Sequence, residues 1–190
     1  MAITLAKGSP VVLAKQDAIT QIVAGLSWDA RRTDGDKFDA DVSAFLLGED
    51  GNVIGGKLES VVFYNNLRSE DGAIVHSGDN RTGDGDGYDE TITIDLNKVN
   101  AAVKRIILTA SVHNVAPANL NFGQITSAAI DINVQGGEKY SYDLAEDHST
   151  HRAVVLVEVY RHQDSWRVKA LDEGYTNGLE QALQAYGVNV

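Results

Sequence analysis

The sequence predicts an all-β fold: an antiparallel β-sandwich with a few short helices, one of them at the C-terminus. Short apolar or alternating runs rich in Val, Ile, Thr and aromatic residues recur along the 190 residues. None of these runs is long enough to favour a helix on length alone. Turn dipeptides of the hairpin kind lie between them, at Asp50–Gly51, Asp71–Gly72 and Gly136–Gly137. Short strands at this spacing are typical of sandwiches and barrels.

The individual elements follow from the same runs. The predicted strands are Ile19–Leu26, Val42–Leu47, Val61–Tyr64, Thr91–Leu96, Ile106–Val112, Ala128–Val134 and Val154–Tyr160. Helical spacing is clearest at the C-terminus, where Thr176 would cap a helix through Leu179, Leu183 and Tyr186 that ends at Gly187. A shorter helix is expected over Asn97–Val103, with Asn97 as its cap.

Composition limits the classes of protein. Hydrophobic content of 43% and charged content of 23%, without a low-complexity linker, predict a single domain over residues 1–190. The net charge of −11 would repel nucleic acid. Cysteine is absent, which rules out thiolate metal sites. With no apparent signal sequence and no apolar run long enough to span a bilayer, we expect a cytoplasmic protein without membrane insertion.

The most informative segment is the acidic, glycine-rich stretch Asp79–Glu90. Its five acids, Asp79, Asp84, Asp86, Asp89 and Glu90, against Arg81 alone, leave a charge of −4. Calcium takes six to eight oxygen ligands, and interleaved glycines allow alternate carboxylates to converge on one ion. Asn80 and Thr82 add neutral oxygens. The stretch therefore favours calcium, although a solvated acidic turn between two strands remains the alternative.

Known calcium motifs do not account for this stretch. It has the length of an EF-hand loop, but Arg81 and Gly83 stand at its third and fifth positions, where oxygen ligands belong. Asp84 replaces the central glycine. A Gly-x-Gly-x-Asp pattern occurs once, and one copy cannot build a β-helix. Magnesium rarely uses an all-protein cage, and zinc prefers cysteine and histidine.

Several short segments, taken in their order along the chain, indicate the protein family more specifically than the acidic stretch does. They are Gly25–Ala30, Phe38–Phe45, Phe63–Asn66, Gly78–Gly83, Asp84–Glu90, Asn121–Gly123 and Trp166–Tyr175. Together they resemble the TerD family of tellurium- and stress-resistance proteins, from residue 2 to the C-terminus. The resemblance implies a β-sandwich that binds two or more Ca²⁺ ions beside its acidic loops. The implied metal ligands are Asp29, Asp39, Asp41, Asp79, Asn80, Asp84, Asp86, Asp89 and Glu90. Thr82 and Gly83 would add backbone carbonyl oxygens as ligands.

One position departs from the family pattern. Tyr88 stands where the first of two paired aspartates is usual. One carboxylate is lost there, so we expect the coordination to differ from that of relatives at this residue.

The implied function is a calcium-binding module in a tellurite-resistance or general stress-response system. Metal occupancy would order the acidic loops and modulate contacts with other proteins of that system, with membrane-associated proteins among the candidates. An enzyme is not expected, because no nucleophile elbow or comparable motif is present. The alternatives are a metal-dependent hydrolase and a structural protein whose subunits are bridged by calcium.

The histidines give a weaker indication of metal binding. His148 and His151 are three residues apart and could chelate a metal on a helical turn. Ser149 and Thr150 between them favour a polar loop instead.

Overall fold

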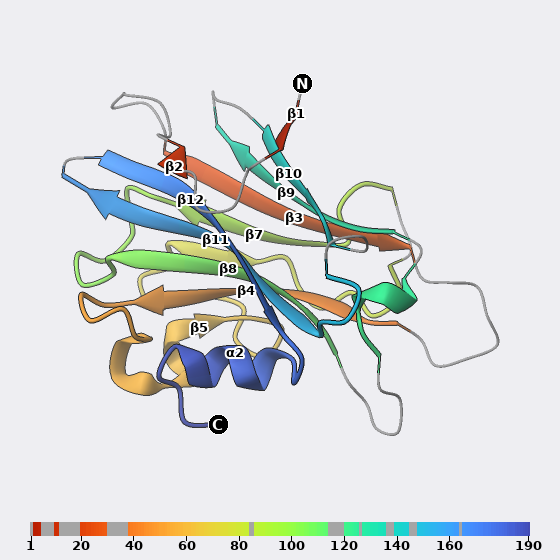
Figure 1. The fold of residues 1–190 in the computed structure, drawn as a ribbon. Coiled ribbons are helices and arrows are strands. Elements are labelled where there is room, and N and C mark those ends of the chain that lie inside the picture. The colour runs from red at the N-terminus through yellow and green to blue at the C-terminus, as the bar shows by residue number, and fades with distance from the viewer. Residues whose placement is uncertain are drawn as a thin grey trace.

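Two six-stranded β-sheets stack face to face in the computed structural model (Figure 1). The structure describes residues 2–4, 10–11, 20–29, 38–83, 86–113, 120–125, 127–135, 139–144, 148–163 and 165–190. The first sheet has the order β1-β10-β9-β3-β7-β6, with β1 (Ala2–Thr4), β3 (Gln21–Asp29), β6 (Ile74–His76), β7 (Glu90–Asp95), β9 (Ser127–Val134) and β10 (Lys139–Asp143). The second has the order β2-β12-β11-β8-β4-β5, with β2 (Pro10–Val11), β4 (Ala40–Leu47), β5 (Val61–Val62), β8 (Arg105–Val112), β11 (Ala153–His162) and β12 (Ser165–Tyr175).

The strand pairings confirm the predicted antiparallel sandwich. They are antiparallel throughout the described residues, except that β1 runs parallel to β10. The helical elements are short: η1 (Ile54–Gly56), η2 (Leu58–Ser60), η3 (Phe122–Gln124) and α2 (Leu179–Ala185). Among the described residues, no helix is long and apolar enough to cross a membrane.

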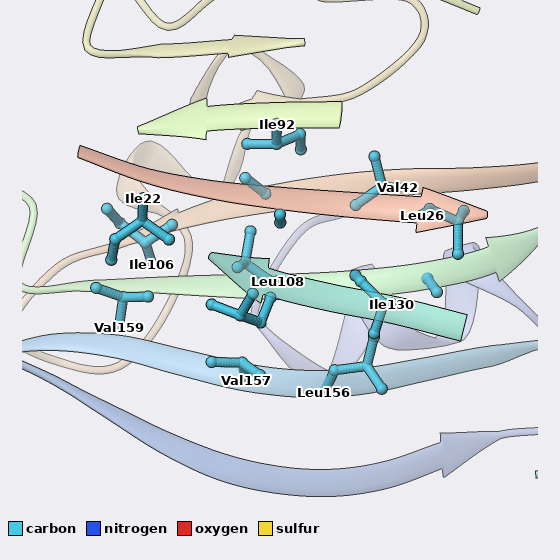
Figure 2. Close-up of a cluster of buried hydrophobic side chains, with 14 of the residues drawn as sticks. Ile22, Leu26, Val42, Ile92, Ile106, Leu108, Ile130, Leu156, Val157 and Val159 are labelled. Atoms are coloured by element: carbon cyan, nitrogen blue, oxygen red, sulfur yellow. The ribbon is translucent and has the colours of Figure 1, made fainter. Parts of the chain in front are cut away.

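The main core lies between the two sheets. Alternate residues of β7 and β9 are buried, as expected for strands with one face toward a core. Figure 2 shows side chains from both sheets meeting in this layer. The first sheet contributes Ile22, Leu26, Ile92 and Ile130, and the second contributes Val42, Ile106, Leu108, Leu156, Val157 and Val159.

The second sheet is also covered on its outer face. Every residue of β4 is buried, because alternate side chains such as Phe45 and Leu47 face a second apolar cluster. Helix α2 lies against this face (Figure 1) and contributes Ala182 and Leu183 to the cluster. Tyr186 packs edge-on against Phe45, with 5.8 Å between the ring centroids. Burial on both faces explains why this strand reads as a continuous apolar run.

Several predicted elements need correction. The C-terminal helix forms, but it starts at Leu179 behind Gly178 and not behind a Thr176 cap. The predicted strand Val61–Tyr64 is limited to Val61–Val62. The prediction of a helix over Asn97–Val103 is wrong, since this segment forms turns. The Asn100 side chain accepts a hydrogen bond from the Ala102 amide, and such local bonds compete with helical ones.

Strands β1, β2, β6, β10 and β12 were not predicted from the sequence. Ile19, at the start of the first predicted strand, and the predicted turn Gly136–Gly137 lie outside the described residues.

Candidate metal site

Three acidic side chains converge at one edge of the sandwich. Asp39 directly precedes β4, Asp41 lies within it, and Asp79 lies in the loop between β6 and β7. Each offers a carboxylate oxygen, and the three oxygens lie within 4.8 Å of one another. Asp39 and Asp41 are two residues apart, so strand geometry directs them to the same side. Calcium–oxygen distances of about 2.3–2.6 Å place ligand oxygens up to about 5 Å apart across an ion, so this spacing fits calcium.

The electrostatics of this acidic cluster (Asp39, Asp41 and Asp79) are unfavourable without a cation. Asp41 is only 2% exposed. Burial, followed by the charges of Glu90, Asp39 and Asp79, raises the pKa of Asp41 to about 8. Burial and then the charge of Asp79 also raise the pKa of Asp39. Among the described residues, Asp39 Oδ1 is buried without a hydrogen-bond partner. A bound cation would satisfy this oxygen and relieve the repulsion.

A buried clasp, formed by Glu90 and His76, ties the cluster to the first sheet. Strand β5 pairs only with Ala44 and Phe45 of β4. The backbone amide and carbonyl of Val42 are therefore not paired with β5 and can bind side chains. The Val42 amide donates to Glu90 Oε2 (2.9 Å), and the Val42 carbonyl lies 3.2 Å from His76 Nε2. Side chains from β7 and β6 thus satisfy the backbone of a strand in the opposite sheet.

Within the clasp, His76 has a defined hydrogen-bonding orientation. Its Nδ1 accepts a hydrogen bond from the Gly78 amide (3.0 Å), so Nε2 carries the proton. That proton faces the Val42 carbonyl and Glu90 Oε2, which lies 3.3 Å from Nε2. Glu90 Oε1 accepts from the Asn80 amide (3.1 Å) and so fixes the start of the acidic loop. Both Glu90 oxygens therefore hold protein groups in place beside the cluster.

The loop after Asp79 is braced by its own polar residues. The Asn80 side-chain oxygen accepts from the amides of Thr82 (3.1 Å) and Gly83 (3.3 Å), and its amide donates to Asp89 (3.4 Å). Asp89 Oδ2 accepts from the Trp28 amide (2.9 Å). Gly83 has a φ of +62°, and a Cβ there would lie 2.6 Å from the indole nitrogen of Trp28. Only glycine fits this close approach.

The remaining predicted ligands lie in other surroundings. Asp29 ends β3, where its Oδ2 accepts a hydrogen bond from the Ser127 hydroxyl (3.0 Å). Asp86 is exposed, and Asp84 lies outside the described residues. Asp79 itself pairs with Arg81 through a 2.8 Å contact at the surface. Of the predicted ligands, the structure therefore brings together Asp39, Asp41 and Asp79.

Tyr88 lies on the outer face of the first sheet. A Cβ at Gly25 would lie 2.4 Å from the Tyr88 ring, so the ring rests directly on the β3 backbone. The Tyr88 hydroxyl donates to Asp131 Oδ2 and accepts from the Asn133 amide, both at 3.0 Å. The residue that departs from the family pattern thus fastens the end of the acidic loop to β9.

Two residues near the cluster were not predicted from the sequence. His113 Nδ1 lies 3.8 Å from Asp41 Oδ2, and the His113 amide donates to the Asp39 carbonyl (2.8 Å). Tyr64 packs edge-on against His113 at 5.4 Å. The antiparallel register of β4 and β8 brings His113 beside Asp39, and no local sequence signal reports that register.

A hollow with a volume of about 820 Å³ lies elsewhere in the structure. Its lining includes Leu46, Ile54, Arg68 and Asn100, and none of the three cluster acids. A hydrolase reading requires a substrate cleft beside the metal. This hollow does not provide one.

Comparisons with known proteins agree with the resemblance read from the sequence. The TerD domain model matches residues 1–186. The tellurium resistance protein TerD of Serratia marcescens is 42% identical over 192 residues, which cover 100% of this chain and 99% of that protein. General stress protein 16U of Bacillus subtilis (strain 168) is 39% identical over 194 residues, covering 100% of both chains.

The fold is shared with a solved structure as well. The crystal structure of a Streptomyces coelicolor A3(2) homologue of the telluride resistance protein TerD superposes with a TM-score of 0.75. The match covers 87% of this chain and 96% of that one, at 20% sequence identity. The full-length matches in sequence, together with this fold, show that the chain belongs to the TerD family of tellurium-resistance and stress-response proteins.

Proposed function

We propose that this chain is a calcium-binding module of a tellurite-resistance or general stress-response system. Ca²⁺ binds at Asp39, Asp41 and Asp79, and its presence orders the acidic loop and alters the contacts that this loop makes with partner proteins. The single observation that supports this proposal most strongly is the burial of Asp41 among acids. A buried carboxylate surrounded by like charges is costly unless a cation or a proton neutralises it.

The donor set favours calcium over other divalent ions. The cluster offers carboxylate oxygens from two separate segments, which suits the flexible, oxygen-rich coordination of Ca²⁺. Magnesium requires near-octahedral geometry at shorter distances and retains most of its water. Zinc favours nitrogen and sulfur ligands.

The proposed regulatory role follows from the position of Asp79. This residue is exposed, while Asp41 is buried, so an ion between them would link the surface loop to the core strand β4. Arg81, Thr82 and Asp86 on the same loop are also exposed. Ion binding would therefore change the order and the net charge of one accessible surface.

Isothermal titration calorimetry with CaCl₂ tests the proposal directly. The wild-type chain should give a saturable signal that is stronger than the signal for MgCl₂. Asp41→Asn should weaken Ca²⁺ binding at least about tenfold, because it removes a charged ligand from the buried side of the site. Glu49→Gln is the matched control, since it removes the same charge from an exposed turn beyond the opposite end of β4.

Two outcomes contradict the proposal. One is a wild-type chain that shows no saturable binding at millimolar Ca²⁺. The other is an Asp41→Asn variant that is folded and binds Ca²⁺ as tightly as the wild-type and Glu49→Gln chains do.

A further inference from the structure

A pair of histidines lies on a tight turn that the acidic cluster does not use. His148 and His151 stand at the two ends of a β-turn closed by a 2.9 Å hydrogen bond from the His151 amide to the His148 carbonyl. Their Nδ1 atoms face each other at 3.4 Å, and the ring centroids are 5.4 Å apart. The polar loop expected from Ser149 and Thr150 therefore places both rings on one side.

The two rings are held in position by the surrounding backbone. The Phe122 amide donates to the His151 carbonyl (3.1 Å), and the Gly123 amide donates to the Ser149 carbonyl (3.0 Å). A Cβ at Gly174 would lie 2.5 Å from three atoms of the His151 ring, so this ring packs directly on β12. His148 is only 7% exposed. The pair is a preorganised feature of the fold.

Asp172 fixes the orientation of His148. Its Oδ1 lies 2.6 Å from His148 Nε2. A carboxylate only accepts, so Nε2 carries the proton and the neutral ring has its lone pair on Nδ1. That lone pair faces His151.

The backbone of β12 is distorted at the residue that makes this contact. Asp172 has a φ of +59°, in the left-handed region. Between the pairs Val155–Glu173 and Val157–Ala170, β12 contains one residue more than β11, so Asp172 lies in a β-bulge. Bulges redirect side chains, and non-glycine residues with left-handed φ are frequent at functional sites. The distortion directs the Asp172 carboxylate to His148.

The separation of the two Nδ1 atoms has two possible physical explanations. A direct N–H···N hydrogen bond has a usual length of about 3.0 Å, so one of 3.4 Å would be long and weak. Two nitrogens bound at 2.0–2.1 Å to one tetrahedral ion lie about 3.4 Å apart. The distance therefore matches a shared metal ion better than a direct bond.

We propose that His148 and His151 bind a zinc-class divalent transition-metal ion through their Nδ1 atoms, with Asp172 as the outer residue that positions His148. A carboxylate that accepts from the second nitrogen of a metal-bound imidazole is a recurrent support for histidine ligands. Two imidazoles select zinc-class ions over calcium, which prefers oxygen. This nitrogen site is therefore chemically distinct from the acidic cluster.

A nearby phenol adds a further polar group. Tyr142 is 9% exposed, and its hydroxyl is buried without a hydrogen-bond partner among the described residues. Burial and then the charge of Asp172 raise the pKa of Tyr142, so the phenol lies within electrostatic reach of that carboxylate.

The nitrogen site lies at the same end of the sandwich as the acidic cluster. The strand register places Asp41 opposite Ser111, Ser111 opposite Ala153, and Ala153 opposite Tyr175. The nitrogen site precedes β11 and packs on β12, so it lies about two to three strand spacings from Asp41 across the second sheet, or about 10–14 Å. At this distance the two ions would bind without sharing a ligand.

The test uses the full chain saturated with Ca²⁺, so that the acidic cluster does not compete for the added metal. Co²⁺ is titrated and followed by its visible absorption, and Zn²⁺ is then added to displace it. His151→Gln should weaken Zn²⁺ binding at least about tenfold, and Asp172→Asn by about 10–100-fold. Asparagine tolerates left-handed φ, so the second variant preserves the bulge. His162→Gln, at the opposite end of β11, is the matched control and should bind as the wild-type chain does.

A readout on the unmutated chain keeps the test independent of folding defects. In ¹⁵N-labelled protein, Zn²⁺ should shift the Nδ1 resonances of His148 and His151 and leave those of His162 unchanged. The proposal is overturned if these resonances do not respond to Zn²⁺. It is equally overturned if a folded His151→Gln variant binds Zn²⁺ with wild-type affinity.

Discussion

At the scale of single residues, Asp41 combines two features that rarely occur together. It lies on β4 with almost no exposure, and the charges of Glu90, Asp39 and Asp79 act on its carboxylate. Burial and like charge both favour the protonated form, which is why the pKa of Asp41 rises from 3.8 to about 8. A proton and a cation therefore compete for the same carboxylate.

This competition predicts an unusual pH dependence. In chelator, the folded chain holds the Asp41 proton more tightly than the unfolded chain does. The contribution of Asp41 to stability is therefore fully present below about pH 4 and is lost as the pH rises to about 8. Chemical denaturation at several pH values, compared with Asp41→Asn, measures this contribution. As the pH rises from 5 to 8, the free energy of unfolding of the wild-type chain should fall relative to that of Asp41→Asn.

Saturating Ca²⁺ should abolish this pH trend near neutrality, because the ion replaces the proton as the neutralising partner. Glu49→Gln should follow the wild-type trend in both conditions. A stability difference between the wild-type and Asp41→Asn chains that stays constant with pH in chelator would show that Asp41 titrates normally.

At the scale of secondary-structure elements, α2 decides how the second sheet is buried. Leu183 is 5% exposed and belongs to the same buried cluster as Phe45, Ile107 and Val155, which come from three strands of the second sheet. Leu183→Ala should lower the free energy of unfolding by about 2–5 kcal/mol, because it removes buried methyl groups and leaves a cavity. Leu67→Ala, at a leucine that is 44% exposed, should change it by less than about 0.5 kcal/mol. Urea denaturation monitored by tryptophan fluorescence measures the free energy of unfolding of both variants. Equal effects would mean that α2 does not contribute to the core.

The elements also show which parts of the fold the sequence predicts. Strands β4, β8 and β11 are buried on both faces and were recognised as apolar runs. Strands β10 and β12 were missed because polar residues occupy their exposed positions, and β12 is interrupted at the Asp172 bulge. The helix predicted over Asn97–Val103 was wrong because Asn100 forms local hydrogen bonds that no periodicity reveals.

The same limit applies to the candidate site. The two-residue spacing of Asp39 and Asp41 on a strand shows in the sequence that they share a side. The approach of Asp79 depends on how the two sheets stack, and the position of His113 depends on the β4–β8 register. Both are long-range consequences of the fold. The resemblance to relatives, and not local pattern, grouped Asp39 and Asp41 with Asp79 in advance.

At the scale of the whole molecule, the acidic cluster joins the two sheets. Asp39 and Asp41 belong to the β4 segment of the second sheet, and Asp79 follows β6 of the first. The His76–Glu90 clasp crosses the same edge through Val42. An ion at the cluster would therefore stabilise the sandwich as a unit and not the loop alone.

Global stability should consequently increase with calcium. At a free Ca²⁺ concentration of 100 times Kd, binding to the folded state adds about 2.7 kcal/mol. For a chain of this size this corresponds to a rise in Tm of roughly 5–11 °C over chelator. Hydrogen exchange should slow at the amides of Val42 and Asn80, which both donate to Glu90; Val42 lies in β4 of the second sheet, and Asn80 lies in the loop after β6 of the first. Protection of Asn80 alone, with an unchanged Tm, would mean that the ion orders only the loop. Protection of both amides, with a Tm rise that is absent in Asp41→Asn, is the result expected if the ion links the two sheets.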